Sequence, residues 1–129
     1  MDKPTNTITL GGMQFDLYFN LTASQELQEK YGDLKELAKK LEKISGAEQI
    51  DVLADLTSML INGANEYNNY FRASDDQIKP MTARDVKALC SISESAHLED
   101  AIVNTILGDS KQKIKSDPTE DSEKNLSDE

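Results

Sequence analysis

The sequence predicts a mainly α-helical protein of the α+β class, in which an N-terminal β-hairpin packs on a bundle of about five helices. Apolar and polar residues alternate on both sides of Gly11-Gly12, a pattern typical of a hairpin. Apolar residues then recur at spacings of three and four over most of the remaining chain, as in amphipathic helices. The last stretch is almost wholly polar. We therefore expect one domain over residues 1–108 and a disordered acidic tail over residues 109–129.

The hairpin is expected between residues 8 and 19. Ile8 and Leu10 alternate with threonines, and two successive glycines supply the positive φ angles that a two-residue turn needs. An isolated hairpin is marginally stable, so its apolar face should be covered by the helices. The return strand is predicted over residues 13–19, with four apolar side chains on one face: Met13, Phe15, Leu17 and Phe19.

Capping signals delimit the first two helices. Thr22 with Gln25 three residues later is a capping-box pattern, and Gly32 is suited to end this first helix. Asp33 with Glu36 repeats the start signal at once and opens the second helix. The second helix carries one apolar stripe, which consists of Leu34, Leu37, Ala38, Leu41 and Ile44.

The third helix, from about residue 47 to residue 71, should form the centre of the core. Apolar residues occur on several of its sides between residues 52 and 61, so we expect neighbouring elements all around it. After Gly63 the helix becomes amphipathic and should be half exposed. A polar loop is expected over residues 73–80.

Two further helices are predicted in the C-terminal part. Thr82 with Asp85 caps a short helix. A break near residues 91–95 separates it from the final helix. Gly108 is expected to end that helix, because glycine commonly follows the last helical turn.

The composition limits the classes of partner. Of the 129 residues, 24 are Asp or Glu and 14 are Lys or Arg, which gives a formal net charge of −10. This charge disfavours binding to nucleic acid and to anionic membrane surfaces, and it favours solubility and basic protein partners. One cysteine cannot form an internal disulfide, and no signal peptide or membrane-spanning run is evident. We therefore expect a cytoplasmic protein.

Few residues suggest chemistry. His97 is the only histidine and is expected to be a surface or capping residue. Cys90 shares a helix face with Val86 and Leu89, which predicts a small buried hydrophobic side chain. A nucleophilic role for Cys90 would need a base, and His97 is the only candidate.

The carboxylate pairs are better explained as solvated side chains. Asp51 and Asp55 share a helix face, but no histidine or cysteine joins them. Asp75-Asp76 lies in a loop without the glycine and alternating oxygen ligands of a calcium site. We therefore predict no catalytic, cofactor-binding or metal-binding residues, and we do not expect an enzyme.

An aromatic group is the more informative feature. Tyr67, Tyr70 and Phe71 lie at helical spacing near the end of the third helix, interleaved with asparagines. One interpretation is a local anchor that packs on the final helix. The other is an exposed contact patch, because aromatic residues are enriched where proteins bind each other.

Four stretches of the sequence resemble the tail assembly chaperones of long-tailed, siphovirus-type bacteriophages. The resemblance spans roughly residues 5–108 and rests on architecture, because this family has no invariant signature. The stretches are residues 8–19 (ITLGGMQFDLYF), 23–34 (ASQELQEKYGDL), 60–66 (LINGANE) and 81–86 (MTARDV).

The resemblance implies a non-catalytic assembly factor of a phage or prophage. Such proteins bind and solubilise the aggregation-prone tape measure protein, recruit tail tube subunits to it, and leave before the virion is complete. The protein would therefore act in the host bacterial cytoplasm, with self-association left open. Its contact surface is expected on the second helix or at the aromatic end of the third: Lys39, Lys40 and Lys43, or Tyr67, Tyr70 and Phe71.

Two other classes stay open. A small acidic phage or prophage inhibitor could mimic nucleic acid and block a host DNA-binding protein, although lysines interrupt the acidic residues of the domain. A structural head–tail component would instead remain in the virion. An enzyme is the least favoured class, because no constellation of residues supports one.

Overall fold

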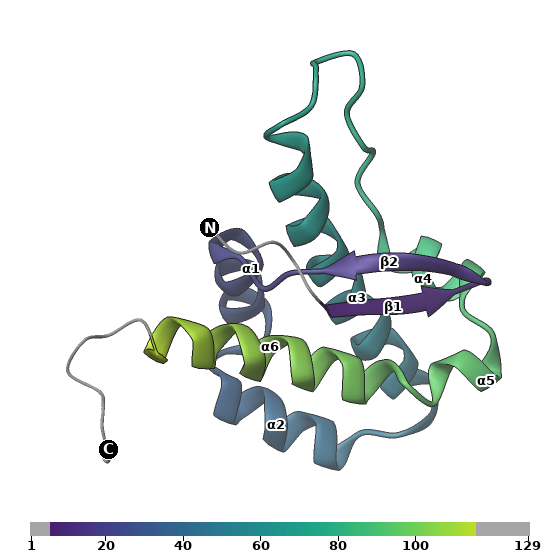
Figure 1. The fold of residues 1–129 in the computed structure, drawn as a ribbon. Coiled ribbons are helices and arrows are strands. Elements are labelled where there is room, and N and C mark those ends of the chain that lie inside the picture. The colour runs from purple at the N-terminus through teal and green to yellow at the C-terminus, as the bar shows by residue number, and fades with distance from the viewer. Residues whose placement is uncertain (1–5, 116–129) are drawn as a thin grey trace.

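The computed structural model describes residues 6–115, and side chains up to Gly108. It confirms the predicted class, with an N-terminal antiparallel hairpin on a set of helices (Figure 1). The predicted disordered tail falls largely outside the described residues. The elements are β1 (Asn6–Leu10), β2 (Met13–Leu17), α1 (Leu21–Tyr31), α2 (Leu34–Lys43), α3 (Gly46–Asn69), α4 (Ala83–Leu89), α5 (Ile92–Ser95) and α6 (Leu98–Lys115).

The hairpin pairs as predicted around Gly11 and Gly12, both of which have positive φ. Its inward face buries Ile8, Leu10 and Leu17, with β2 against α3 and β1 against α6. The predicted return strand is too long, because β2 ends at Leu17. The chain leaves the sheet there to cross α3, which removes the next residues from strand pairing.

Helix α3 is the centre of the core, as predicted. It runs from the bottom to the top of Figure 1, and its middle is covered on several sides by the other elements. Ile50, near its start, is 57% exposed and therefore does not belong to the core. The buried residues of α3 are Val52, Leu53, Ala54, Leu56, Thr57, Ser58, Met59, Leu60, Ile61, Gly63 and Ala64.

A close backbone crossing places the hairpin and α1 on α3. The amide of Tyr18 donates a hydrogen bond to the carbonyl oxygen of Leu60, 3.0 Å away. A Cβ atom built on Gly63 would overlap the carbonyl oxygen of Tyr18, so only glycine allows this approach. The next polar residue, Asn20, donates to the Glu66 carboxylate at 2.8 Å.

A carboxylate clamps the hairpin turn to the C-terminal half of the chain. Glu94 accepts hydrogen bonds from the amides of Gly11 (2.8 Å), Gly12 (3.2 Å) and Ser91 (2.9 Å). The Ser91 hydroxyl in turn accepts from the Glu94 amide, which completes a capping box at α5. These amides favour the ionised carboxylate and lower the pKa of Glu94 to about 2.

Two predicted helix boundaries are wrong. Asn20 caps α1 instead of Thr22, because its side chain accepts from the Ala23 amide while it also bonds to α3. The predicted stop at Gly108 fails, since α6 continues to Lys115 and a helical glycine costs only about 1 kcal/mol. The domain boundary placed at Gly108 therefore lies inside a helix.

Two further expectations need correction. The predicted break near residues 91–95 contains a helical turn, α5, which the Ser91 capping box starts. The apolar stripe of α2 is only partly covered: Leu37 is buried, whereas Leu34 is 38% exposed. The predicted capping boxes at Asp33–Glu36 and Thr82–Asp85 are both present.

Replacing Gly63 by alanine should destabilise the fold by about 2–3 kcal/mol, because backbone must move at the crossing. Gly108→Ala is the matched control, since a Cβ there would meet only the Asn6 side-chain nitrogen, at an ordinary contact distance of 4.0 Å. It should be neutral or stabilise the protein by up to about 1 kcal/mol. Urea unfolding of both variants measures this. Equal stability of the two variants would show that the crossing is not tight.

Glu94 should make stability depend on pH. Its pKa is lower in the folded protein than the ordinary value of 4.5, so its contribution is complete above pH 4.5 and is lost as pH falls toward 2. Glu94→Gln should therefore be less stable than the native chain at pH 7, and the difference should shrink between pH 4.5 and pH 2. Urea midpoints across this range test the prediction. A constant difference would contradict it.

Candidate partner-binding surfaces

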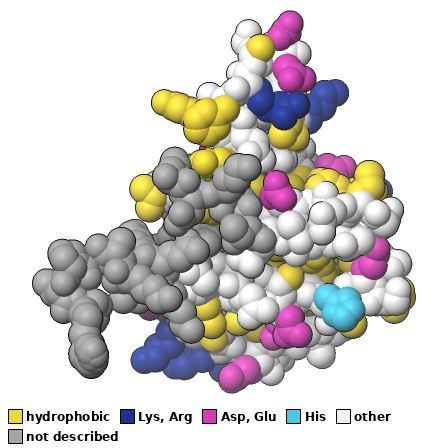
Figure 2. Space-filling model, in the orientation of Figure 1, with side chains coloured by type: hydrophobic (Ala, Val, Ile, Leu, Met, Phe, Trp, Pro, Cys, Tyr) yellow, Lys and Arg dark blue, Asp and Glu magenta, His cyan; other side chains and the backbone are white. Residues whose placement is uncertain are grey.

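An aromatic cluster lies at the C-terminal end of α3. The Tyr67 ring packs edge-on against Tyr18 and Phe71, with centroids 5.5 and 5.4 Å apart. Tyr70 packs on Phe71 in the same manner, at 5.4 Å. Tyr70 is 86% exposed and Phe71 is 68% exposed, and yellow side chains protrude beside the upper end of α3 in Figure 2. Ring contacts to Tyr18 and this exposure do not fit the interpretation of an anchor on the final helix.

Two asparagines hold the segment that follows these aromatic residues. The Asn69 side chain accepts from the Ile78 amide at 2.7 Å and donates to the Ile78 carbonyl oxygen at 3.0 Å. Asn62 makes the same pair of bonds with Met81, both at 2.7 Å. The returning chain is therefore fixed along α3 (Figure 1). Sequence reasoning missed this role, although seven-residue spacing places both asparagines on one helix face.

The lysines of α2 form a separate surface. Lys39 and Lys43 are exposed, and Lys40 lies 3.5 Å from the Glu48 carboxylate. Basic side chains gather at the lower left of Figure 2, in the region of α2. Since α2 lies near the beginning of α3 and the aromatic cluster at its end, the structure does not bring the two predicted surfaces together.

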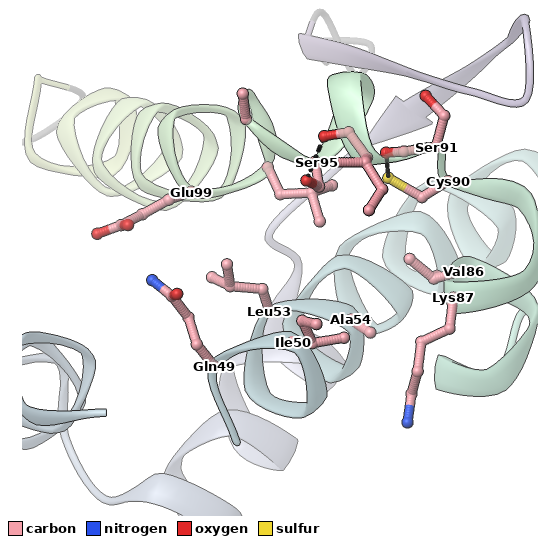
Figure 3. A pocket seen from close by; sticks show the side chains of 13 residues that line it. Gln49, Ile50, Leu53, Ala54, Val86, Lys87, Cys90, Ser91, Ser95 and Glu99 are labelled. Atoms are coloured by element: carbon pink, nitrogen blue, oxygen red, sulfur yellow. Dashed lines mark hydrogen bonds between the residues drawn. The ribbon is translucent and has the colours of Figure 1, made fainter. Parts of the chain in front are cut away.

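A cavity of about 460 Å³ opens between α3, α4, α5 and the start of α6 (Figure 3). Leu53, Val86 and Leu98 form buried walls, and exposed Ile50 and Ile92 border the opening. We call this cavity the α3–α6 groove. Sequence reasoning missed it, because its walls come from four helices and no local pattern marks a surface of that kind.

Cys90 and His97 lie close to the groove in the fold. Cys90 lines it and is only half buried, so the prediction of a buried side chain is partly wrong. Partial burial and the nearby Glu94 carboxylate raise the pKa of its thiol, which disfavours the thiolate. His97 is exposed, as predicted, and its carbonyl oxygen accepts the Ala101 amide at the start of α6.

The other pKa shifts, those of Tyr31 and Asp85, are explained by contacts within the fold. Burial and the Asp55 carboxylate, 2.6 Å from its hydroxyl, raise the pKa of Tyr31. The Thr82 backbone amide and hydroxyl lower the pKa of Asp85 within the α4 capping box. Asp51 pairs with Lys87 at 2.6 Å.

Among residues 6–108, no three metal-binding side chains come together. Within the described part of the chain, no helix is long and apolar enough to cross a membrane. Comparisons with protein-family models, with curated proteins and with solved structures found no match. The resemblance described above therefore stays a hypothesis that rests on residues of this chain.

Asn69→Ala should release the segment after α3, because the Ile78 amide and carbonyl lose their partners. We expect trypsin to cleave after Arg72 several-fold faster in this variant, as measured by mass spectrometry of the native protein. Asn68→Ala is the control, since no hydrogen bond of that side chain is seen among the described residues. Equal cleavage rates in the two variants would show that Asn69 does not fix the segment.

Proposed function

We propose that this protein is a phage tail assembly chaperone, which binds and solubilises the tape measure protein and helps to recruit tail tube subunits. The observation that carries this proposal is the exposed aromatic pair at the end of α3. Tyr70 and Phe71 leave most of their surface in solvent, which is unusual for two adjacent large aromatic side chains. A partner that covers them would bury apolar surface that folding leaves in contact with water, which favours binding.

The aromatic pair packs against other aromatic rings of the domain. Phe71 packs on Tyr67, which packs on Tyr18, and both of these tyrosines are half-buried. Asn69 fixes the following chain to the same helix end. A patch that is ordered before binding loses less conformational freedom when a partner arrives, which favours binding by Tyr and Phe anchors.

The charge of the chain suits a protein that keeps an apolar partner in solution. Its net charge of −10 opposes self-aggregation, while the exposed Lys39 and Lys43 offer a local basic contact. Two separate surfaces would allow modest affinity at each contact and hence release later in assembly. In this proposal the protein acts in the host bacterial cytoplasm, is absent from the finished virion, and uses no metal or cofactor.

Tyr70→Asp with Phe71→Asp should abolish or strongly reduce solubilisation of the tape measure protein encoded near this gene. Both side chains are exposed, so the fold should survive, and circular dichroism checks this. Charge reversal of Lys39, Lys40 and Lys43 should weaken solubilisation less, because exposed charges contribute little each. The assay is co-expression followed by measurement of soluble, co-purified tape measure protein.

Leu21→Asp is the matched control, since Leu21 is 76% exposed on α1 and belongs to neither surface. Its variant should behave like the native chain. If the native chain fails to solubilise the tape measure protein, the proposal is wrong. Capture of a basic DNA-binding host protein, lost at raised salt, would then favour the inhibitor, and presence in purified particles would favour a structural component.

A further inference from the structure

The α3–α6 groove is a third surface, which the proposed function does not use. It lies beside the first half of α3, away from the aromatic cluster at the other end of that helix (Figures 1 and 3). Its walls are hydrophobic where they are buried, through Leu53, Val86 and Leu98. The groove opens to solvent where the exposed Ile50 and Ile92 border it.

Two large aliphatic side chains border the groove without being covered. Ile92 is 90% exposed on α5, and Ile50 is 57% exposed on α3. Both line the same cavity, Ile50 from α3 and Ile92 from α5. Isolated exposed aliphatic residues are ordinary, but two that flank one apolar groove extend its hydrophobic surface outward. A helix of a partner, bound between α3 and α5, would cover Ile50 and Ile92 and pack its own side chains between them.

The groove lining carries one basic and one acidic side chain, and the one that is left without an ion pair is acidic. Lys87 is its one basic lining residue, and the Asp51 carboxylate 2.6 Å away neutralises that charge. Glu99 lies at the edge of the groove, followed by Asp100, and neither forms an ion pair with a described residue. In the described part of the face in Figure 2, magenta carboxylates lie near the cyan side chain of His97, and no dark blue Lys or Arg is seen beside it.

The charge of the whole domain has the same sign. Residues 6–108 contain 16 acidic and nine basic side chains, and five of those nine lie between residues 30 and 43, on α1 and α2. A second copy of this chain would therefore bring a like net charge to the groove. A partner helix with Lys or Arg beside its apolar stripe would instead meet complementary charge.

We propose that the α3–α6 groove binds an amphipathic α-helix of another protein, with an aliphatic stripe seated between Ile50 and Ile92 and basic side chains beside Glu99. This inference goes beyond the proposed function, because it assigns a different surface and stands even if the tape measure protein is not a partner. Cys90 lines the groove, so a bound helix covers its thiol.

The test uses the full chain and synthetic 18-residue helical peptides. One peptide carries leucines at spacings of three and four with lysines beside them, a second replaces the lysines by glutamates, and a third scrambles the lysine peptide. Fluorescence anisotropy measures Kd, and alkylation of Cys90 at pH 8 reports whether the groove is covered. The lysine peptide should bind and slow alkylation several-fold, whereas the scrambled peptide should do neither.

Variants locate the contact. Ile92→Glu and Ile50→Glu should each weaken binding of the lysine peptide about tenfold or more, the loss expected for one buried isoleucine. Glu99→Lys should weaken it about two- to fivefold at low salt and should improve binding of the glutamate peptide. The matched control is Leu21→Glu, on an exposed aliphatic residue outside the groove, which should leave Kd unchanged.

Three outcomes would overturn the proposal. Equal loss of binding in Ile92→Glu and Leu21→Glu would show non-specific apolar adhesion. Undiminished alkylation of Cys90 with bound peptide would place the contact elsewhere. A dimer in sedimentation that Ile92→Glu converts to monomer would assign the groove to a second copy of the chain. None of these outcomes depends on the tape measure assay, so failure of the two proposals can be distinguished.

Discussion

A hydrogen bond from the Tyr18 amide to the Leu60 carbonyl oxygen marks the close crossing at which the chain leaving the hairpin meets the central helix. It requires backbone to approach backbone, and glycine at position 63 is what permits that distance. The adjoining residues depend on it. Asn20 caps α1 while bonding to Glu66, and the Tyr18 ring supports Tyr67. The hairpin, α1 and the aromatic cluster therefore all contact α3 at or beside this crossing.

Polar side chains hold the irregular segments in place through hydrogen bonds to their backbone. Asn62 and Asn69 replace the backbone partners that a neighbouring strand would supply, and Glu94 does the same for the hairpin turn. Each of these side chains forms hydrogen bonds with backbone groups that would otherwise need water as a partner. This arrangement lets a domain with little aromatic content keep Tyr70 and Phe71 out of its core, where they remain accessible to a partner.

Elements with local signals were predictable from the sequence, and features built by distant residues were not. The capping boxes at Asp33 and Thr82 give their helix starts correctly, because cap and partner are three residues apart. At α1, a contact with α3 selects Asn20 over Thr22, which no local pattern shows. The helical spacing predicts the aromatic residues as a group, but no local pattern shows the contact between Tyr67 and Tyr18. The groove combines residues 49–99, and the surfaces themselves stay predictions until partners are measured.

The Glu94 clamp has a consequence for the order in which the chain can fold during synthesis. Gly11 leaves the ribosome before its carboxylate partner, which follows 83 residues later, and β1 also packs on α6. The hairpin's apolar face therefore stays uncovered while most of the domain is being translated. Long-range closure of this kind slows folding and exposes nascent strands to misassembly. Chains truncated before α5 should accordingly be captured by ribosome-associated folding factors.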